Sequence, residues 1–572
     1  MKKLFTLLCA GVVQFVFAQN PLLIPDTLNG TTFNLNVQTG TNVFFPPNTT
    51  PTYGYNGNFL GPTLFLNKWD SVTMNVTNNL STSTTVHWHG LHLPAVCDGG
   101  PHQIITPGST WSPVFRVLND AGTFWYHPHG DMTTELQVTR GLGGLIIIRD
   151  SAEAALALPR TYGVDDFPLI VQSKSFDVLY QLAPYTVDDS IMMVNGTIDP
   201  FLQVPQQIVR LRLLNATANR VYNFGLNNDS SFYVIGTDGG LLEQPVQLNR
   251  IILSPGERVE ILVDFSAYAV SQSVNLISYA SELPRGYMGA DSVGNVQYQI
   301  PDYYNNPLNG ADFNIVRFDV IAPTSNPVLT VPSALVTLNP WLEAQATVNR
   351  DIIITPDSSI VGPVAMVEGP FLMNGSMFDM DSVNEIVYIN DIEIWTLINN
   401  SMVAHPFHIH DVQFYVLDIN GNPPPAVLSG QKDVVTVEPF DTVRFITRFE
   451  HFADTSTPFM YHCHLLHHED EGMMGSFIVV DTNALSASEH PVLSDEINLY
   501  PNPASETVIL RVPADINCVS VYNSTGELVY SVDSLRKTSI EINVRNWAPG
   551  CYIANALTDD GRSCSVRFII SR

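Results

Sequence analysis

Short runs of alternating apolar and polar residues recur along most of the chain, separated by Gly, Pro and Asn. SVTMNV at 71–76, RVEILVDF at 258–265 and DTVRFITRF at 441–449 are examples. Successive side chains of a β strand point to opposite faces, so this alternation predicts strands that are buried on one side. Their length and the turn residues between them are typical of β sandwiches. We therefore expect an all-β fold.

The grouping of these runs predicts four successive domains. At 572 residues the chain is too long for a single hydrophobic core. After Asp481 the sequence changes to TNALSASEHPVLSDE, a polar stretch with small residues that is typical of a linker. The predicted boundaries are 19–152, 153–332 and 333–483 for three sandwiches, 484–495 for the linker and 496–572 for a small fourth sandwich.

The first residues, MKKLFTLLCAGVVQFVFA at 1–18, combine two lysines, an apolar run and a small final residue. This composition predicts a cleavable secretory signal. Lipid attachment at Cys9 is the alternative, but the preceding Leu8 is large and the apolar run continues beyond it. No later segment offers the ~18 consecutive apolar residues that a membrane-spanning helix needs. We therefore expect a mature protein that is exported, soluble and without a transmembrane segment.

The net charge narrows the range of partners. It is −29 at neutral pH, and loss of Lys2 and Lys3 with the leader would make it about −31. Such an acidic chain repels nucleic acid and anionic membranes, so neither is an expected partner. General solubility is one consequence of the acidity, and attraction of cations such as metal ions is another.

The six cysteines do not form an obvious disulfide set, even though disulfides are common in exported proteins. Cys9 would leave with the leader, and Cys463 stands among histidines. The remaining four are Cys97, Cys518, Cys551 and Cys564. The last two could bridge neighbouring strands, although spacing alone does not fix the pairing.

Four short motifs hold ten of the fifteen histidines. One H-x-H pair is weak evidence for a metal site, because many ordinary strands contain one, but four pairs in one chain are not explained as core histidines. Within each pair both side chains lie on the same face of a strand, ~7 Å apart. Eight imidazoles could therefore converge on two or three copper or zinc ions. The motifs are HWHG (His87, His89), HPHG (His127, His129), HPFHIH (His405, His408, His410) and HCHLLHH (His462, His464, His468).

The alternation of side chains along a strand separates a second set of metal donors from these eight imidazoles. Cys463 lies between the two histidines of the last H-x-H pair, so its thiolate points to the other face of the strand. Together with His405 and His468 it forms a His₂Cys set, and Met473 can add a weak axial sulfur, as in blue copper electron-transfer centres. Iron–sulfur and structural zinc sites are excluded because the chain has no C-x₂-C pair. One strand would thus connect two metal sites.

These motifs resemble those of the multicopper oxidases, which include laccases, bilirubin oxidases and bacterial cuprous oxidases, over about residues 22–483. The resemblance implies three cupredoxin-like Greek-key sandwiches, of which the first and third hold four copper ions. It implies a type 1 copper held by His405, Cys463, His468 and Met473, with the rim of the site at His468 and His405 receiving the electron and Cys463 passing it to the neighbouring histidines. It further implies a type 2 copper at His87 and His408, and a type 3 pair at His89, His127, His129, His410, His462 and His464.

Two acidic residues match groups that supply protons in this family. Asp98, in CDGGPH, corresponds to an acid beside the three-copper cluster, and Glu469 directly follows His468. The alternative is that DGG is an ordinary turn and HHEDEG a solvated loop. His92 and His467 fall outside the family pattern. The middle sandwich offers no donor cluster, so we expect it to act as a spacer and interface.

The implied reaction is one-electron oxidation of phenols or aromatic amines, coupled to the reduction of dioxygen to water. Two alternatives remain. Cu(I) oxidation in copper detoxification is favoured by four methionines within fifteen residues, because thioether sulfur binds Cu(I) well. A non-catalytic copper-binding relative is the other. The four methionines are Met366, Met373, Met377 and Met380.

The last block resembles the C-terminal sorting domain of proteins exported by the type IX secretion system of Bacteroidota. YPNP at 500–503 and APG at 548–550 carry this resemblance. It implies that the secretion machinery is a partner, and that the protein passes through the periplasm before release or attachment at the cell surface. A carbohydrate-binding or adhesion module is the alternative.

Overall fold

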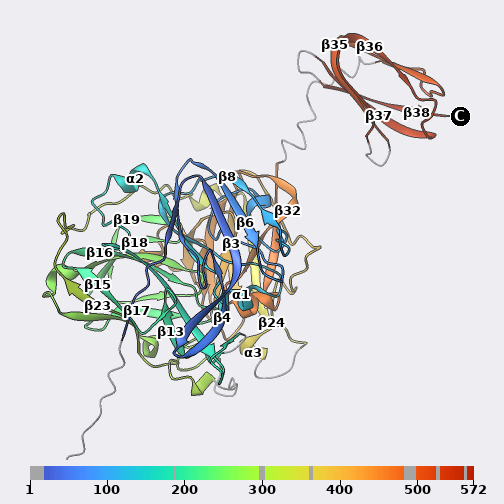
Figure 1. The fold of residues 1–572 in the computed structure, drawn as a ribbon. Helices are drawn as coiled ribbons and strands as arrows, with labels where there is room; N and C mark the ends of the chain where they lie inside the picture. Colours follow the sequence, from blue (N-terminus) through green and yellow to red (C-terminus); the bar gives the residue numbers. More distant parts are fainter. Residues whose placement is uncertain are drawn as a thin grey trace, which may run out of the picture. The chain divides into compact units, whose positions relative to one another are not determined.

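The computed structural model describes residues 19–184, 187–294, 303–359, 365–481, 498–523, 528–558 and 563–571. The predicted leader at 1–18 and linker at 484–495 lie outside these residues. The chain divides into two compact units, one ending at Val480 and the other beginning at Asp481. β strands dominate both units (Figure 1), so the prediction of an all-β fold is confirmed.

Two mixed sheets that share one core form the first sandwich. Their strand orders are β4-β3-β6-β7, with β8 also paired to β6, and β2-β5-β10-β9. On β3, Phe33, Leu35 and Val37 are buried while the residues between them are exposed, so the alternating pattern places one face against the core. The strands are β2 Thr27–Asn29, β3 Thr32–Phe45, β4 Asn48–Tyr55, β5 Thr63–Asn67, β6 Ser71–Asn78, β7 Thr110–Trp111, β8 Val114–Arg116, β9 Gly122–Tyr126 and β10 Gly144–Arg149.

The second sandwich includes a strand from the very start of the described chain. Its sheets are ordered β1-β15-β23-β22-β17-β20 and β14-β13-β11-β16-β21-β18-β19, with β12 paired to β11. The two-residue β1 thus pairs with β15, although it precedes the first sandwich in sequence. The strands are β1 Asn20–Pro21, β11 Asp166–Phe176, β12 Leu182–Ala183, β13 Ile191–Val194, β14 Thr197–Ile198, β15 Pro200–Pro205, β16 Ile208–Asn215, β17 Tyr222–Leu226, β18 Phe232–Thr237, β19 Gly240–Leu248, β20 Ile251–Leu253, β21 Arg258–Asp264, β22 Ser273–Ser278 and β23 Phe313–Ile321.

The third sandwich carries two of the four histidine motifs on paired strands. Its sheets are ordered β25-β24-β27-β31-β29 and β26-β33-β32-β28-β30. In the second sheet, β28 and β32 run antiparallel and set His408 opposite His462. The strands are β24 Val348–Pro356, β25 Phe371–Met373, β26 Glu385–Tyr388, β27 Ile392–Asn399, β28 His405–Ile409, β29 Phe414–Ile419, β30 Val434–Val437, β31 Thr442–Arg448, β32 Asp454–Cys463 and β33 Met474–Val480.

Helices are short, and two of them lie next to the histidine motifs. The α-helices are α1 Thr134–Thr139, α2 Ser151–Ala154, α3 Ala365–Glu368 and α4 Leu466–Asp470. The 3₁₀ helices are η1 Ala95–Cys97, η2 Phe265–Ala267, η3 Ala280–Glu282, η4 Tyr303–Asn305, η5 Glu343–Gln345 and η6 Ala426–Leu428.

Helix α1 follows the HPHG motif and is held at both ends by other sandwiches. At its first turn, the backbone N–H groups of Thr134 and Glu135 donate to the carboxylate of Asp470 in α4, each at 2.9 Å. An acidic acceptor satisfies the free N–H groups of a helix start and favours its dipole. At the last turn, Nζ of Lys174 in β11 donates to the carbonyl oxygen of Val138 at 3.1 Å. This short helix therefore connects all three sandwiches.

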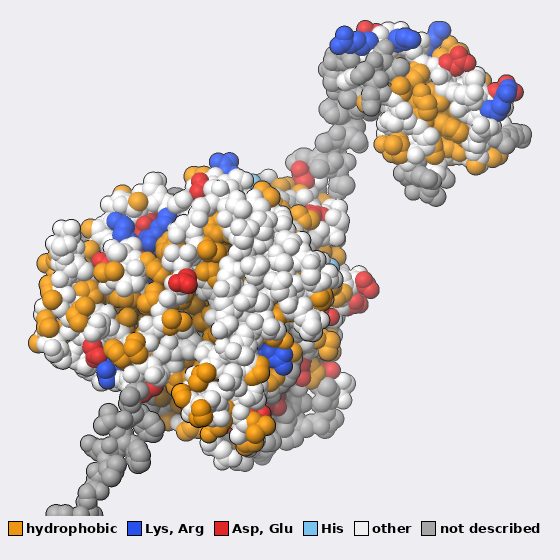
Figure 2. Space-filling model, in the orientation of Figure 1, with side chains coloured by type: hydrophobic (Ala, Val, Ile, Leu, Met, Phe, Trp, Pro, Cys, Tyr) orange, Lys and Arg blue, Asp and Glu red, His pale blue; other side chains and the backbone are white. Residues whose placement is uncertain are grey.

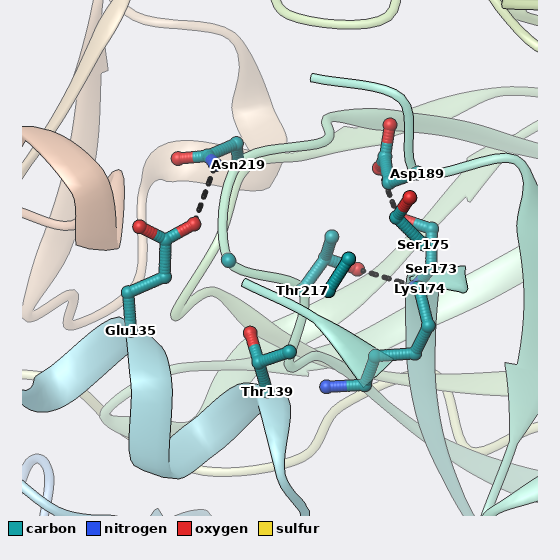
Figure 3. Close-up of a pocket in the computed structure, with 10 residues that line it drawn as sticks. Glu135, Thr139, Ser173, Lys174, Ser175, Asp189, Thr217 and Asn219 are labelled. Carbon is teal, nitrogen blue, oxygen red and sulfur yellow. Dashed lines mark hydrogen bonds between the residues drawn. The ribbon is translucent and has the colours of Figure 1, made fainter. Parts of the chain in front are cut away.

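A small cavity lies beside Lys174, between α1 and the second sandwich (Figure 3). Its volume is about 20 Å³, which is enough for one water molecule. Burial lowers the pKa of Lys174 to about 7, although the nearby carboxylates of Glu135 and Asp189 favour the charged ammonium group. The lysine is thus a buried base in a polar setting.

The C-terminal unit is a five-stranded sheet ordered β34-β35-β37-β38, with β36 paired to β35. The register places Cys551 opposite Ile569 and Cys564 opposite Ala556. Cys551 is a free thiol. The predicted bridge between these two cysteines is therefore wrong, because the strand pairing offsets them along the sheet. The strands are β34 Asn498–Tyr500, β35 Thr507–Asn523, β36 Leu528–Asn543, β37 Gly550–Thr558 and β38 Ser563–Ile570.

The surface carries few positive charges. Over the larger unit, Lys and Arg side chains lie in small separate groups on the face that Figure 2 shows. The chain has 26 Lys and Arg against 55 Asp and Glu, so this distribution does not favour a polyanionic partner. Within the described residues, no helix has the length and apolar character needed to cross a bilayer.

Candidate metal centres

The four histidine motifs meet as two hydrogen-bonded pairs of chain segments. In the first sandwich, His87 and His127 exchange backbone hydrogen bonds of 2.8 and 3.1 Å in an isolated bridge. In the third sandwich, β28 and β32 pair His408 with His462. Each pairing sets one H-x-H motif against another, so four imidazoles project from each sandwich.

The eight imidazoles of the H-x-H pairs gather between the first and third sandwiches. Each of these residues is at most 1% exposed. Three sets of three ring nitrogens can be formed in which all members of a set lie within 4.8 Å of one another, so each set could hold a metal ion. We call these eight residues the histidine cluster. The sets are His89, His127 and His464; His129, His410 and His462; and His87, His408 and His410.

Hydrogen bonds decide which ring nitrogen faces the centre of the histidine cluster. Nδ1 of His87 donates to the carbonyl oxygen of Asp98 at 3.0 Å, and Nδ1 of His408 donates to that of Asp433 at 2.8 Å. Nε2 of both rings is buried without a hydrogen-bond partner. Buried polar atoms are rarely left unpaired, and a metal ion would supply the partner that each Nε2 lacks.

His89 is oriented the other way round. Its Nε2 lies 3.2 Å from Oδ1 of Asp433, and its Nδ1 faces Nε2 of His127 at 3.4 Å. An N–H donated from Nε2 leaves the lone pair on Nδ1. His89 therefore offers Nδ1 to the histidine cluster, while His87 and His408 offer Nε2.

Two carboxylates contact the outer nitrogens of the histidine cluster. Oδ2 of Asp98 lies 2.7 Å from Nδ1 of His410. Glu469 spans two rings, with Oε1 at 3.3 Å from Nδ1 of His129 and Oε2 at 3.1 Å from Nδ1 of His462. Both acids are at most 2% exposed, so the Glu469 side chain does not belong to a solvated loop. Each carboxylate thus lies directly behind an imidazole of the cluster.

A separate sulfur-containing group lies on the other face of β32. Sγ of Cys463 is 3.6 Å from Nδ1 of His405 and 3.7 Å from Nδ1 of His468. A metal bonded to sulfur at ~2.3 Å and to nitrogen at ~2.0 Å, near a tetrahedral angle, would span a similar distance. Met473 is fully buried in the same core cluster, and its carbonyl oxygen accepts a 3.1 Å hydrogen bond from the N–H of Cys463. We call these four residues the type 1 group.

The surroundings prepare the type 1 group for a metal. Oγ of Ser401 lies 2.8 Å from Nε2 of His405, which leaves Nδ1 directed at Cys463. Burial lowers the pKa of His405 to about 3, so the ring is neutral, as a metal ligand must be. Burial also raises the pKa of the Cys463 thiol, so formation of the thiolate depends on a bound cation. The donors fit copper, for which His₂Cys with a weak Met ligand is the blue copper set.

The structure brings together every residue that the sequence singled out as a candidate ligand or proton carrier. His92 and His467 lie outside both groups. His92 contacts the carboxylate of Asp411 at 2.7 Å, and His467 lies 3.5 Å from Glu135. Of the clustered methionines, Met373 is buried against the type 1 group's core, whereas Met377 is 44% exposed.

Sequence reasoning missed the contribution of the second sandwich. Arg258, at the start of β21, forms a two-pronged ion pair with Asp433, with both N–O distances at 2.6 Å. Gly256 packs so closely on His464 that an added Cβ would lie 2.8 Å from its ring. The sequence Ser-Pro-Gly-Glu-Arg at 254–258 is recognisable as a turn, but nothing in the neighbouring sequence indicates that this turn contacts another sandwich.

Comparisons with known proteins agree with this geometry. Multicopper oxidase family models match residues 36–153, 183–287 and 348–483, and a secretion system C-terminal sorting domain model matches 498–571. The multicopper oxidase mco of Staphylococcus haemolyticus is 34% identical over 460 residues, covering 78% of this chain and 88% of its own. The cell division protein FtsP of Pectobacterium atrosepticum is 32% identical over 492 residues, covering 82% and 96%.

Among solved structures, one similar fold is that of a laccase-like multicopper oxidase from the lignin-degrading bacterium Ochrobactrum sp. The TM-score is 0.70 at 32% sequence identity, and the match covers 80% of this chain and all of the other. Three family matches in succession, together with relatives matched over nearly their whole length, show that the chain belongs to the multicopper oxidase family and ends in a secretion-system sorting domain.

Proposed function

We propose that this protein is a laccase-like oxidase that takes single electrons from phenols or aromatic amines and reduces dioxygen to water. The observation that carries the proposal is the position of Cys463, which faces the type 1 group while His462 and His464 on either side of it belong to the histidine cluster. A single strand thereby connects a one-electron site with a site that can accommodate several ions. Such a connection has little use in a protein that only stores metal.

The proposed cofactors are four copper ions, one in the type 1 group and three in the histidine cluster. When bound, copper would supply one-electron exchange at the first site and the multi-electron reduction of dioxygen at the second. His405 and His468 would receive the electron from the donor. Cys463 would pass it through the adjoining peptide bonds to His462 or His464.

Proton supply is assigned to the two buried acids. Reduction of one dioxygen to water consumes four electrons and four protons. Glu469 contacts His129 and His462, and Asp98 contacts His410. Each acid is therefore close enough to transfer a proton directly to the histidine cluster. The two acids contact different rings of the histidine cluster, which supports separate proton routes.

A second candidate function is the oxidation of Cu(I). Met373 and Met366 pack against the core that contains Cys463, and thioether sulfur binds Cu(I) well. Against this, the methionine-rich stretch forms the four-residue α3, the short β25 and turns, and no extended methionine-rich helix occurs among the described residues. We therefore rank the organic donors first.

A non-catalytic role is the third candidate, because the similar protein from P. atrosepticum carries the name of a cell division protein. A purely structural relative does not need complete metal sites. This chain retains ten motif histidines, Cys463 and both acids, all buried and mutually oriented. Their retention supports catalysis.

The C-terminal unit supports an extracellular location. Its match to a secretion-system sorting domain indicates export. We propose that the protein crosses the periplasm and is carried over the outer membrane by the type IX machinery, to be released or held at the cell surface. The phenolic and amine donors would then be encountered outside the cell.

Oxygen uptake distinguishes the three candidates. Copper-loaded, full-length protein would be supplied in turn with a phenol, an aromatic amine and Cu(I), and the initial rates compared. We expect the fastest uptake with an organic donor. A preference for Cu(I) would favour the second candidate, and a blue protein that consumes oxygen with none of the three would overturn the enzymatic proposal.

A further inference from the structure

The second sandwich supplies none of the predicted ligands, yet through Asp433 it is linked to His89, whose ring faces the histidine cluster in the opposite sense to those of His87 and His408. Nε2 of His89 is held by Oδ1 of Asp433, which lies just before β30 in the third sandwich. The other two rings described above are held by backbone carbonyl oxygens. A side chain can rotate, so the orientation of His89 depends on whatever fixes Asp433.

Arg258 fixes Asp433. Its Nη1 and Nη2 donate to Oδ1 and Oδ2 of the carboxylate, each at 2.6 Å, and both side chains are completely buried. A two-pronged guanidinium–carboxylate pair fixes both the position and the rotation of the carboxylate. A lysine in the same place would fix only its position. The carboxylate therefore presents Oδ1 to His89 in one orientation.

The guanidinium is itself immobilised, because all five of its N–H groups are used. In addition to the two bonds to Asp433, Nε donates to the carbonyl oxygen of Thr123 at 3.2 Å, Nη1 to that of Gly256 at 2.9 Å and Nη2 to that of Asp238 at 3.0 Å. Five is the full donor capacity of an arginine side chain. Thr123 belongs to the first sandwich, Gly256 and Asp238 to the second, and Asp433 to the third, so this one group joins all three.

Two glycines allow the backbone to approach this ion pair and the histidine cluster. Gly90, directly after His89, has φ of +83°, and an added Cβ would lie 2.3 Å from Oδ2 of Asp433. Gly256 has φ of +85° and lies against the ring of His464. Both positions combine a left-handed backbone with a close contact, which only glycine tolerates. The second sandwich thus reaches His89 through Arg258 and Asp433, and His464 through direct packing.

We infer that the second sandwich positions the type 3 ligands, through the relay from Arg258 to Asp433 to His89. This inference rests on the proposed function, since it takes His89, His127 and His464 as ligands of one copper ion. Arg258 and Asp433 are positioning residues, which fix the tautomer of His89 so that Nδ1 carries the lone pair. Without the relay the hydrogen bond that fixes the tautomer of His89 is lost, and the lone pair on Nδ1 is no longer held toward the ion that His89 shares with His127 and His464.

The test is Arg258→Lys in full-length, copper-loaded protein, with copper content and spectra as readouts. Lysine keeps the positive charge but cannot hold both carboxylate oxygens. Loss of a contact that orients a metal ligand typically weakens metal binding ~10–100-fold. We expect less copper per chain under limiting copper, loss of near-ultraviolet absorption from the coupled type 3 pair, and a new paramagnetic copper signal. The blue absorption should remain.

The control is Arg317→Lys. Arg317 also lies in the second sandwich and also forms a two-pronged pair, with Asp319 at 2.9 Å for both contacts, but it is partly exposed. This variant should keep all copper signals. Asp433→Asn is the second test variant, because it retains an acceptor oxygen while removing the charge pair, and we expect a smaller loss than with Arg258→Lys.

The possible outcomes separate the inference from the proposed function. If wild-type protein itself shows no coupled pair of copper ions, the proposed function fails. If wild-type protein shows the pair, and Arg258→Lys and Asp433→Asn retain it with unchanged copper affinity, the relay is overturned. Should Arg258→Lys not fold, as judged by loss of the blue absorption and of its thermal transition, Asp433→Asn alone decides.

Discussion

Sγ of Cys463 and Nδ1 of His405 lie 3.6 Å apart, although 58 residues separate them in the chain. The pairing of β28 with β32 brings them together. On β28, His405 lies three residues before His408, and on β32, Cys463 directly follows His462. Both His408 and His462 belong to the histidine cluster. Removal of the sulfur should therefore disable one metal site and spare the other.

We expect Cys463→Ser to abolish the blue absorption and substrate oxidation while the histidine cluster still binds copper. Serine keeps the strand and its hydrogen bonds, but its hydroxyl is a poor replacement for a soft thiolate ligand. Copper content should fall from four ions per chain towards three. Metal analysis and absorption spectra would measure this, and blue colour in the variant would contradict the assignment of the type 1 group.

Met473→Leu should raise the reduction potential of the type 1 group. The methionine is fully buried in the core beside Cys463, so leucine can fill the space while removing the weak sulfur donor. Axial donors tune the potential of blue copper centres, and removal of one favours the reduced ion. A redox titration followed by the blue absorption would measure the shift. An unchanged potential would mean that Met473 does not approach the metal.

Glu469→Gln should slow turnover without affecting the blue absorption. The amide is nearly the same size, and its oxygen can still face Nδ1 of one of the two rings that Glu469 contacts, but the amide cannot take up and release a proton. Loss of a general acid–base group typically costs ~10²–10⁴-fold in rate. Steady-state oxygen uptake would measure the loss, and a larger solvent isotope effect would identify it as a proton step. Normal turnover would reject the role of Glu469.

Much of the site was predictable because strand geometry is local. The two-residue period of a strand places Cys463 opposite to its two flanking histidines, and the structure gathers the residues accordingly. The alternation on β3, where Phe33 and Leu35 are buried, likewise follows from the sequence alone. These features depend only on neighbours along one strand.

The features that were missed depend on contacts between distant segments. Arg258 reaches Asp433 across 175 residues, and nothing in either local sequence identifies the partner. Asp470 caps α1 from 336 residues away. The suggested bridge from Cys551 to Cys564 is not formed, because the pairing of whole strands sets the register, and this register places the two cysteines apart.

Removal of the C-terminal unit should separate export from catalysis. Residues up to Val480 form one compact unit and those from Asp481 another, each with its own hydrophobic core. A chain that ends at Asp481 should keep its blue absorption, its oxidase activity and the thermal transition of the large unit. It should accumulate in the periplasm instead of reaching the medium. Fractionation and immunoblotting would test this, and efficient secretion of the truncated chain would contradict the sorting role.

Lys174 should make the stability of the large unit depend on pH above neutrality. Its folded-state pKa is lowered by burial to about 7, from an ordinary value of 10.5. Between these two values the unfolded chain binds a proton that the folded chain lacks, so stability rises as pH increases through this window. Below about pH 7 the full penalty of placing the ammonium group in the cavity applies.

Replacement of Lys174 by methionine tests this linkage, because the apolar chain fills the same space without a charge. The stability of wild type relative to Lys174→Met should increase from pH 7 to 10, by at most about 1.4 kcal/mol per pH unit. Thermal unfolding of both proteins across this range would measure it. Lys68→Met, which removes a lysine paired with Asp120 at the surface, provides the control. If the difference in stability between wild type and Lys174→Met does not change with pH, Lys174 keeps its ordinary pKa. Water or the carboxylates of Glu135 and Asp189 would then compensate for its burial.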